Sequence, residues 1–344
     1  MTAPRIDYRL RDGGFVLRDV RIGIGFHWDR REEQEFEGEL EIMHNADGTQ
    51  TAVNVLDIED YLTSVISSEM SADSPLELLK AHTVIARSWV LRRLQLHDSG
   101  HAGYDVCGDD HCQRYEGVRR RNERAMQAVR ETAGEVLMYD EAVCDCRYHK
   151  CCGGRTEQFE TCWEDVHVPY LTLAECPWCG RAAQMRGRLT FLNDYDRETR
   201  DFHDWEVRYT DEELDHIVRE KSGAELGHIT DLQPLSRGVS GRIYRLRVVG
   251  TKGEREIGKE LTIRQWLSRS CLYSSWFDVS HEGGVWTLRG HGWGHGVGLC
   301  QIGAAVWAGE GADYRTILAH YYPGAQAVAE TESPRPDNGQ VTAR

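Results

Sequence analysis

The pattern of apolar and polar positions divides the chain into a region of strands followed by a region of helices. Residues 1–56 are predicted as strands, because the stretches FVLRDVRIGIGF and FEGELEIMH alternate apolar and polar residues, with the turn sequence NADG before TAVNVL. From about residue 58 the period becomes helical, with one apolar stripe formed at positions i, i+4, i+7 and i+8 by Ile58, Leu62, Val65 and Ile66. The next position on this stripe, i+11, is Glu69.

A second helix is predicted to start at Ser74, which offers an N-cap followed by Pro75 at the first helical position and by Glu77 three residues on. This helix runs to about His97. Its apolar residues cover almost the whole circumference, which is typical of a helix buried in a core.

The remaining elements are shorter. NERAMQAVRETAGEVLMYD predicts a third helix that ends at Gly134 and leads into the strand EVLMY. Residues 180–225 are charged and poor in apolar residues, with a short helix in DEELDHIV, and ITDLQPLSRGVSGRIYRLRVVG returns to strand patterning. These patterns predict an α+β fold of mixed strands on a few buried helices, with the following segments: an N-terminal β segment 1–56, a core formed by 57–179 and 236–326, a charged insertion 180–235 and a flexible tail 327–344.

Composition narrows the classes of function. The 344 residues are 40% hydrophobic and 28% charged, which suits a folded protein, and no apolar run approaches the ~18 residues of a membrane-spanning helix. The first residues lack the basic-then-apolar pattern of a secretory signal. The net charge of -15 repels nucleic acid and anionic membranes, so neither is expected as a partner.

Glu69 is the first chemical candidate. A carboxyl group that continues an apolar stripe, with the next helix close behind, is expected to lie against an apolar wall. Such surroundings raise the pKa of a carboxyl group, which is what a general acid needs near neutral pH. The alternative is a glutamate that simply turns out to solvent. Arg87, among core residues of the second helix, is either a structural ion pair or a substrate clamp.

A glycine-rich run, LRGHGWGHGVGLCQIGAAVWAGEG, is the second candidate. It does not match a nucleotide-binding fingerprint. Glycine at alternate positions allows the backbone to approach a ligand closely, and it places His291 and His295 on a loop before a helix predicted at about 300–308. The alternatives are a tight structural turn and a paired-histidine metal site, although the glutamate and helical context of H-E-x-x-H are missing.

The motifs together resemble the stage II sporulation protein D (SpoIID/LytB) family over residues 53–326. They are, in order, YLTSVISSEM and LELLKAHTVIARSW, DVCGDDHCQRYEG, YHKCCGGRTE, SRGVSGRI, and GHGWGHGVGLCQIGA with YRTILAHYYPGA. The resemblance implies either a lytic transglycosylase of peptidoglycan or a stimulator of cell-wall amidases. It implies that Glu69 is the catalytic glutamate. The family's arginine matches Arg87, and Tyr148 and Tyr322 match aromatic positions that either line a cleft or belong to the core.

The 11 cysteines are clustered, which favours metal sites over scattered disulfides. Two sulfurs and two imidazoles with the spacing H-x5-C-x3-H-C form a complete tetrahedral zinc set, and the resemblance implies the same set in some family members. A closed site of this kind is structural, and a disulfide between the two cysteines is the alternative. The four predicted ligands are His101, Cys107, His111 and Cys112.

A second cysteine group departs from the family pattern, since many relatives carry serine or threonine within KCCGG. A second zinc site or disulfides are both open for it, and the pairing is not assigned by the sequence. Redox catalysis is disfavoured because no thioredoxin-like pattern surrounds the C-x-x-C pair. The group comprises Cys144, Cys146, Cys151, Cys152, Cys162, Cys176 and Cys179.

These expectations combine into one hypothesis. The protein is predicted to cleave the bond between N-acetylmuramic acid and N-acetylglucosamine in peptidoglycan glycan strands, in a cleft between the Glu69 helix and the glycine-histidine loop. No cofactor is expected for the chemistry. A non-catalytic activator that binds a cell-wall amidase is the main alternative, and a metal-dependent amidase that uses His291 and His295 is a third. The family implies the cell envelope or periplasm, whereas a cytoplasmic role on recycled wall fragments is the alternative. The predicted substrate-binding residues are Arg87, Tyr148, His291, His295, Gln301 and Tyr322.

Overall fold

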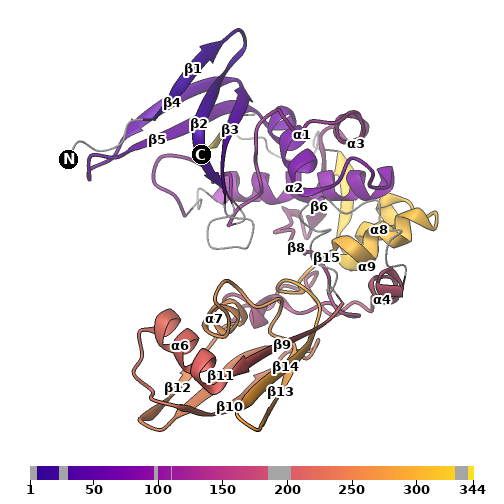
Figure 1. Cartoon of the computed structure of the whole chain (residues 1–344). Coiled ribbons are helices and arrows are strands. Elements are labelled where there is room, and N and C mark those ends of the chain that lie inside the picture. Colours follow the sequence, from indigo (N-terminus) through magenta and orange to yellow (C-terminus); the bar gives the residue numbers. More distant parts are fainter. Residues whose placement is uncertain (1–5, 23–29, 97–99, 110, 185–202, 330–339) are drawn as a thin grey trace.

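Two large hydrophobic cores organise the chain into two lobes (Figure 1). The computed structural model describes residues 6–22, 30–96, 100–109, 111–184, 203–329 and 340–344. Helices and antiparallel sheets both contribute to these residues, which confirms the predicted α+β class.

The N-terminal region consists of strands, as predicted. β1, β2 and β3 form one antiparallel sheet, while β4 and β5 belong to a second. The strands are β1 (Tyr8–Arg11), β2 (Gly14–Ile22), β3 (Arg30–Glu37), β4 (Glu39–His44) and β5 (Gln50–Asp57). Asp57 at the end of β5 caps the first helix by accepting a hydrogen bond from the Glu59 N–H, so the switch from strand to helix takes place within a single residue.

Three helices then build the centre of the larger lobe: α1 (Ile58–Glu69), α2 (Leu76–Leu96) and α3 (Glu123–Glu131). The predicted burial of α2 is confirmed, because every residue from Ala81 to Leu91 is buried. Helix α2 contacts α1, α3, α8, α9 and β6, which explains why apolar residues are needed on all its sides.

The rest of this lobe comes from two distant parts of the chain. Parallel pairing of β8 with β15 places Tyr148 beside Leu299 and His149 beside Cys300. Helices α4 and α8 also pack together. The elements are β6 (Glu135–Tyr139), β7 (Ala142–Val143), β8 (Tyr148–His149), η1 (Phe159–Thr161), α4 (Pro177–Gln184), β15 (Leu299–Cys300), α8 (Gln301–Gly309), α9 (Tyr314–Tyr321) and β16 (Gln326–Ala329).

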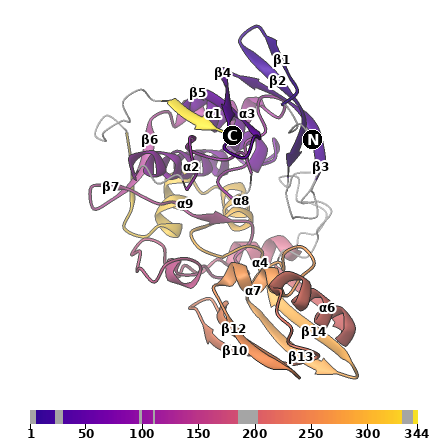
Figure 2. The ribbon, with the colours of Figure 1, turned by 90° about the vertical axis from the view of Figure 1, so that its left-hand side faces the viewer.

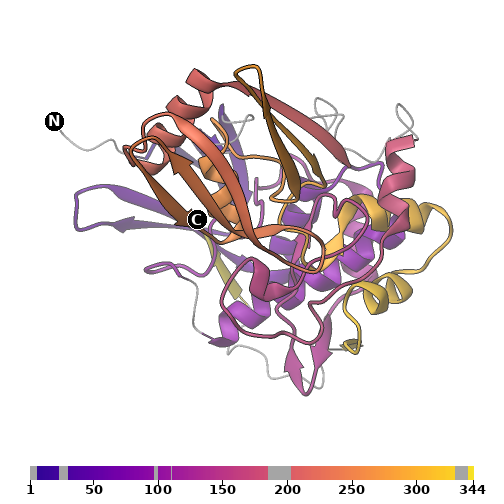
Figure 3. The same ribbon diagram turned by 90° about the horizontal axis from the view of Figure 1, so that it is seen from below.

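The smaller lobe contains two three-stranded sheets, β10-β11-β12 and β13-β14-β9, on which α6 and α7 pack (Figures 1 and 3). Its core runs from Trp205 to Leu288, so the predicted boundary between an insertion 180–235 and a core segment 236–326 falls inside β10. The strands of this lobe bury only one face, so its sequence has a low apolar content. For this reason the sequence pattern did not indicate a separate core. The elements are β9 (Asp204–Thr210), α6 (Asp211–Ser222), β10 (Ile229–Arg237), β11 (Ile243–Gly250), β12 (Gly253–Ile257), α7 (Glu260–Trp266), β13 (Phe277–Glu282) and β14 (Val285–His291).

The predicted flexible tail 327–344 contains strand residues at both of its described ends, 327–329 in β16 and 340–343 in β17. Strand β17 (Gln340–Ala343) pairs antiparallel with β5 and completes the sheet β17-β5-β4 (Figure 2). Val341 and Ala343 are buried against the larger core. Alternation in QVTA was too short a signal to be recognised among polar neighbours.

Candidate functional site

Glu69 is the last residue of α1, where the chain leaves the helix through an extended Met70. The apolar stripe before it faces the core, since Leu62, Val65 and Ile66 are fully buried. Glu69 itself is half-buried. The side chain therefore stands at the border between the core and solvent, and it does not swing freely in water.

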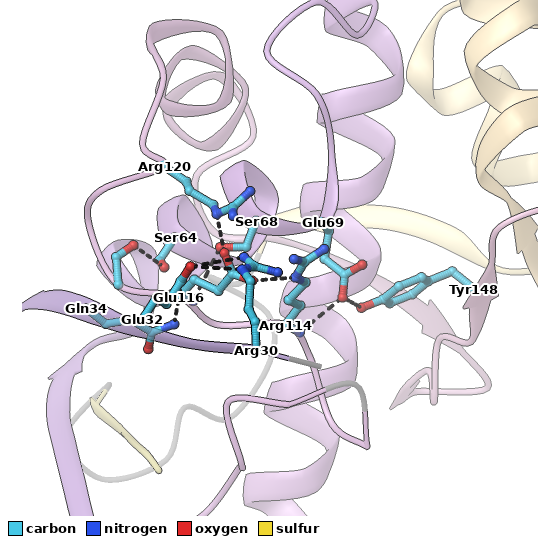
Figure 4. A network of polar contacts seen from close by, with 11 residues as sticks. Arg30, Glu32, Gln34, Ser64, Ser68, Glu69, Arg114, Glu116, Arg120 and Tyr148 are labelled. Atoms are coloured by element: carbon cyan, nitrogen blue, oxygen red, sulfur yellow. Dashed lines mark hydrogen bonds and ion pairs between the residues drawn. The ribbon is translucent and has the colours of Figure 1, made fainter. Parts of the chain in front are cut away.

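Two hydrogen-bond donors hold one oxygen of this carboxyl group (Figure 4). The backbone N–H of Arg114 donates to Oε1 over 3.1 Å, and the Tyr148 hydroxyl donates to the same atom over 3.0 Å. The sequence led us to expect an apolar wall, but polar donors provide the contacts. Two hydrogen bonds to one oxygen fix the orientation of the Glu69 carboxyl group.

The loop that supplies Arg114 contains a buried carboxylate and is joined to α1 through its backbone. Glu116 is only 2% exposed and accepts a hydrogen bond from Arg114 Nε over 2.7 Å. Arg120 forms an ion pair with the other Glu116 oxygen, and the backbone N–H of Glu116 donates to Ser68 Oγ over 3.3 Å (Figure 4). Two guanidinium groups thus share one buried carboxylate close to Glu69.

The Tyr148 ring packs against a histidine, His82, that is not among the predicted site residues. The rings of His82 and Tyr148 meet edge to face with centroids 4.5 Å apart, and His82 Nε2 lies 3.1 Å from the Gln301 Nε2. His82 is fully buried, and this burial lowers its pKa to about 3, so the imidazole is neutral and can accept from the amide. The available signal was an imidazole among the core-facing residues of α2.

Three of the predicted substrate-binding residues are buried in this structure: Gln301, whose amide faces His82, Arg87 and Tyr322. The Arg87 guanidinium binds both oxygens of Glu59 over 2.7 Å and the Glu135 carbonyl over 3.0 Å, with no exposed side-chain area. Glu59 lies in the first turn of α1, ten residues or about 15 Å of helix from Glu69. Arg87 therefore fits the ion-pair alternative.

Tyr322 is likewise fully buried. Its hydroxyl donates to the Arg147 carbonyl over 2.6 Å and accepts from the Leu299 N–H over 3.2 Å. This tyrosine joins β15 to the chain before β8 and fits the core alternative.

The glycine-histidine loop is wrapped around a buried arginine. Gly292, Gly294, Gly296 and Gly298 all have positive φ, and a Cβ on Gly296 would stand 2.4 Å from Arg242 Cζ. Arg242 donates to the carbonyl oxygens of Gly294 and Cys152 over 3.3 and 3.2 Å. The glycines thus allow the loop backbone to approach the Arg242 side chain closely.

The two histidines of this loop have separate surroundings. His291 Nδ1 lies 2.7 Å from Asp204 Oδ1. The ring centroids of His291 and Trp276 are 4.9 Å apart. His295 packs against His149 and Trp163, and burial lowers its pKa well below the usual value. Neither histidine has a contact with Glu69 among the interactions of the described residues.

Ligand atoms for a metal gather in two places within the described part of the chain, and neither place includes His291 or His295. The first is the predicted set His101, Cys107, His111 and Cys112, whose ligand atoms all lie within 4.8 Å of one another. His101 Nε2 is 3.2 Å from Cys112 Sγ. Tetrahedral zinc with bonds of about 2.0–2.3 Å separates its ligands by roughly 3.3–3.8 Å, so this donor set fits the ion.

Comparisons with known proteins show to which family the chain is related. Residues 46–139 match the family model "Stage II sporulation protein", and residues 157–298 match a domain of unknown function, DUF8618. An uncharacterised protein of Brachyspira hyodysenteriae is 30% identical over 280 residues, which cover 81% of this chain and 69% of that protein. The stage II sporulation protein D of Bacillus subtilis is 25% identical over 82% of this chain and 77% of its own length.

A further relative is the amidase enhancer of Bacillus subtilis, which is 28% identical over 76% of this chain and 39% of its own length.

Among the described residues, no helix has the length and apolar character needed to cross a bilayer. Together the family match and these relatives support a role connected with the cell wall. The chain belongs to the stage II sporulation protein D (SpoIID) family.

Proposed function

We propose that this protein is a lytic transglycosylase that cleaves the bond between N-acetylmuramic acid and N-acetylglucosamine in peptidoglycan glycan strands of the cell envelope. Glu69 is the general acid and base. The observation that carries the proposal is the fixed, half-buried Glu69 carboxyl group, whose Oε1 is held by the Tyr148 hydroxyl and the Arg114 N–H. Its half-exposed position leaves it open to a ligand.

One carboxyl group suffices for this reaction. The acid donates a proton to the glycosidic oxygen as the bond to C1 breaks, and the resulting carboxylate accepts the proton of the muramic acid C6 hydroxyl. The C6 oxygen then bonds to C1 and closes a 1,6-anhydro ring. Because this nucleophile belongs to the substrate, its effective concentration is high and no second carboxylate is needed to position water.

The neighbours of Glu69 act as positioning residues. Tyr148 and Arg114 fix the carboxyl group, and His82 with Gln301 fixes the Tyr148 ring. Substrate contact by His291 and His295 stays a prediction. We also infer that His101, Cys107, His111 and Cys112 hold a zinc ion, because their ligand atoms converge. Four protein ligands leave no position for water, so this ion is structural.

The first test is incubation of the purified protein with peptide-free glycan strands, followed by mass spectrometry. Anhydro-ended fragments are expected from the wild type, and Glu69→Gln is expected to reduce their rate of formation at least 100-fold. Glu41→Gln, on the exposed face of β4, is the matched control and should keep the wild-type rate. Full product from Glu69→Gln would remove this residue from the mechanism.

A second candidate function is favoured by one relative, the amidase enhancer. In this alternative the chain binds a cell-wall amidase and raises its activity without cleaving glycan. The two functions separate in one experiment, because an activator yields no anhydro product alone but increases the release of free peptides by an added amidase. A metal-dependent amidase predicts peptide release by this chain alone and its loss with chelators.

A further inference from the structure

Four cysteines from distant segments meet in the interior of the larger lobe. Cys152 follows β8, Cys176 and Cys179 lie at the start of α4, and Cys300 ends β15. All four are buried, and their sulfur atoms lie within 4.8 Å of one another, with Cys152 and Cys179 sulfurs 3.4 Å apart. We propose that these four thiolates bind a second, structural zinc ion.

The spacing of the sulfurs fits one tetrahedral ion. Zinc–sulfur bonds of about 2.3 Å place the sulfurs of a four-thiolate site roughly 3.8 Å apart. A disulfide requires about 2.05 Å and joins only two sulfurs, whereas all 11 cysteines are free in the structure. A multi-iron cluster would spread its cysteine sulfurs over the width of its core. One thiophilic ion explains why four sulfurs converge.

The polar groups around the sulfurs are those expected around metal-bound thiolates. Backbone N–H groups of Gly154 and Gly303 donate to Cys152 and Cys300 sulfurs over 3.4 and 3.3 Å. The Cys152 N–H donates to the Cys300 sulfur over 3.3 Å. Cys300 is also the N-cap of α8, where the helix dipole favours a negative sulfur. Such donors orient and stabilise metal-bound thiolates.

The remaining cysteines of the group lie outside this set. Cys162 places its sulfur 3.5 Å from the His295 carbonyl. Cys144 and Cys146 interact with each other. Cys151 is adjacent and contacts Cys179 and Cys300, but its sulfur is not within the four-sulfur set. Cys151 and Cys152 are adjacent in the sequence, but only Cys152 belongs to the four-sulfur set. Substituting each of them in turn therefore tests which cysteine is a ligand.

The ion would fix the two chain segments that carry Tyr148 and Gln301 next to the candidate active site. Tyr148 precedes Cys152 by four residues, and Gln301 directly follows Cys300. The same ion would join α4 to the start of α8, two helices that already pack together. With four protein ligands the site is closed, so the ion stabilises the fold and supplies no catalytic water.

Metal analysis of the full-length protein, purified without chelator, tests the proposal independently of any enzymatic activity. The wild type is expected to contain two zinc ions per chain, one for each ligand cluster. Cys152→Ser and the double variant Cys176→Ser/Cys179→Ser should each lose one ion, whereas Cys151→Ser and the distant Cys271→Ser should keep both. Loss from Cys151→Ser but not from Cys152→Ser would overturn the ligand set.

Two measurements keep the proposal testable if the variants fail to fold. Titration of the denatured, unreduced wild type should find all 11 thiols; two missing pairs would favour disulfides. Cobalt reconstitution of His101→Ala, which impairs the other cluster, should retain an intense thiolate-to-cobalt charge-transfer band typical of four thiolates. Absence of that band, or iron in place of zinc in the wild type, would overturn the zinc assignment.

Discussion

At the scale of single residues, the Tyr148 hydroxyl is the contact that most directly orients Glu69. Tyr148→Phe removes this donor and keeps the ring that packs on His82. We expect kcat for anhydro product formation to fall about tenfold, because a hydrogen bond to a charged group contributes about 1.5 kcal/mol or more. KM should stay unchanged. Tyr8→Phe, at an exposed ring, is the control, and a wild-type kcat for Tyr148→Phe would contradict the positioning role.

The buried His82 makes stability depend on pH. Its pKa is about 3 in the folded protein and 6.5 when exposed, because burial penalises the charged imidazole. Below pH 6.5 the unfolded chain binds a proton that the folded chain does not, so stability falls as pH decreases towards 3, by up to about 1.4 kcal/mol per pH unit.

His82→Gln should remove this part of the slope. Denaturant unfolding between pH 7 and pH 5 measures it, and the variant should lose about 2 kcal/mol less than the wild type over this interval. His44→Gln, at an exposed position of β4, should keep the wild-type slope. Identical slopes for all three proteins would show that His82 does not stay neutral in the fold.

At the scale of elements, the Glu59–Arg87 pair fastens α1 to α2. Glu59→Gln leaves the fully buried Arg87 guanidinium without its carboxylate, and we expect a loss of about 3 kcal/mol of unfolding free energy. Glu131→Gln breaks a more exposed ion pair, between Lys80 of α2 and Glu131 of α3, and should cost much less stability. Equal, small losses in denaturant unfolding would contradict the anchoring role of Arg87.

Most elements could be predicted because each one buries a face with a regular period. The apolar stripe of α1, the all-round apolar α2 and the segment of α3 before Gly134 indicate helices in this way. The smaller lobe was not recognised as a unit, since its strands alternate among many charges and its core forms only when residues 205 to 288 come together. Strand β17 was missed because four residues carry too little pattern.

At the scale of the whole molecule, the C-terminal strand connects the sheet of β5 to the loop that carries the first metal ligands. Thr342 exchanges hydrogen bonds with Asp105, and the Gly108 N–H donates to the Arg344 carbonyl over 2.6 Å. Cys107 lies between these two attachment points.

Deletion of residues 340–344 should therefore lower stability and loosen the first zinc site together. We expect a loss of about 3 kcal/mol, because the deletion removes the buried Val341 side chain and the strand pairing with β5. Zinc should be released from the first cluster at lower chelator concentration, while the four-cysteine cluster keeps its ion. Thr342→Val, which removes only the hydroxyl contacts, should show a smaller effect. Wild-type stability and zinc retention after the deletion would disprove the coupling.

The sequence by itself determined the α+β class, most of the helices, the place of Glu69 at the end of an apolar stripe and the local grouping of two histidines and two cysteines between His101 and Cys112. These features depend on near neighbours, so a period or a short spacing is enough to encode them. Only the tertiary structure decided that Tyr148 and Arg114 hold Glu69, that His82 and Gln301 support Tyr148, that Arg87 and Tyr322 belong to the core, and that Cys152, Cys176, Cys179 and Cys300 converge. Those contacts join residues up to 219 positions apart, as in the His82–Gln301 pair, and no local pattern specifies which distant side chain will fill a given place in a packed core.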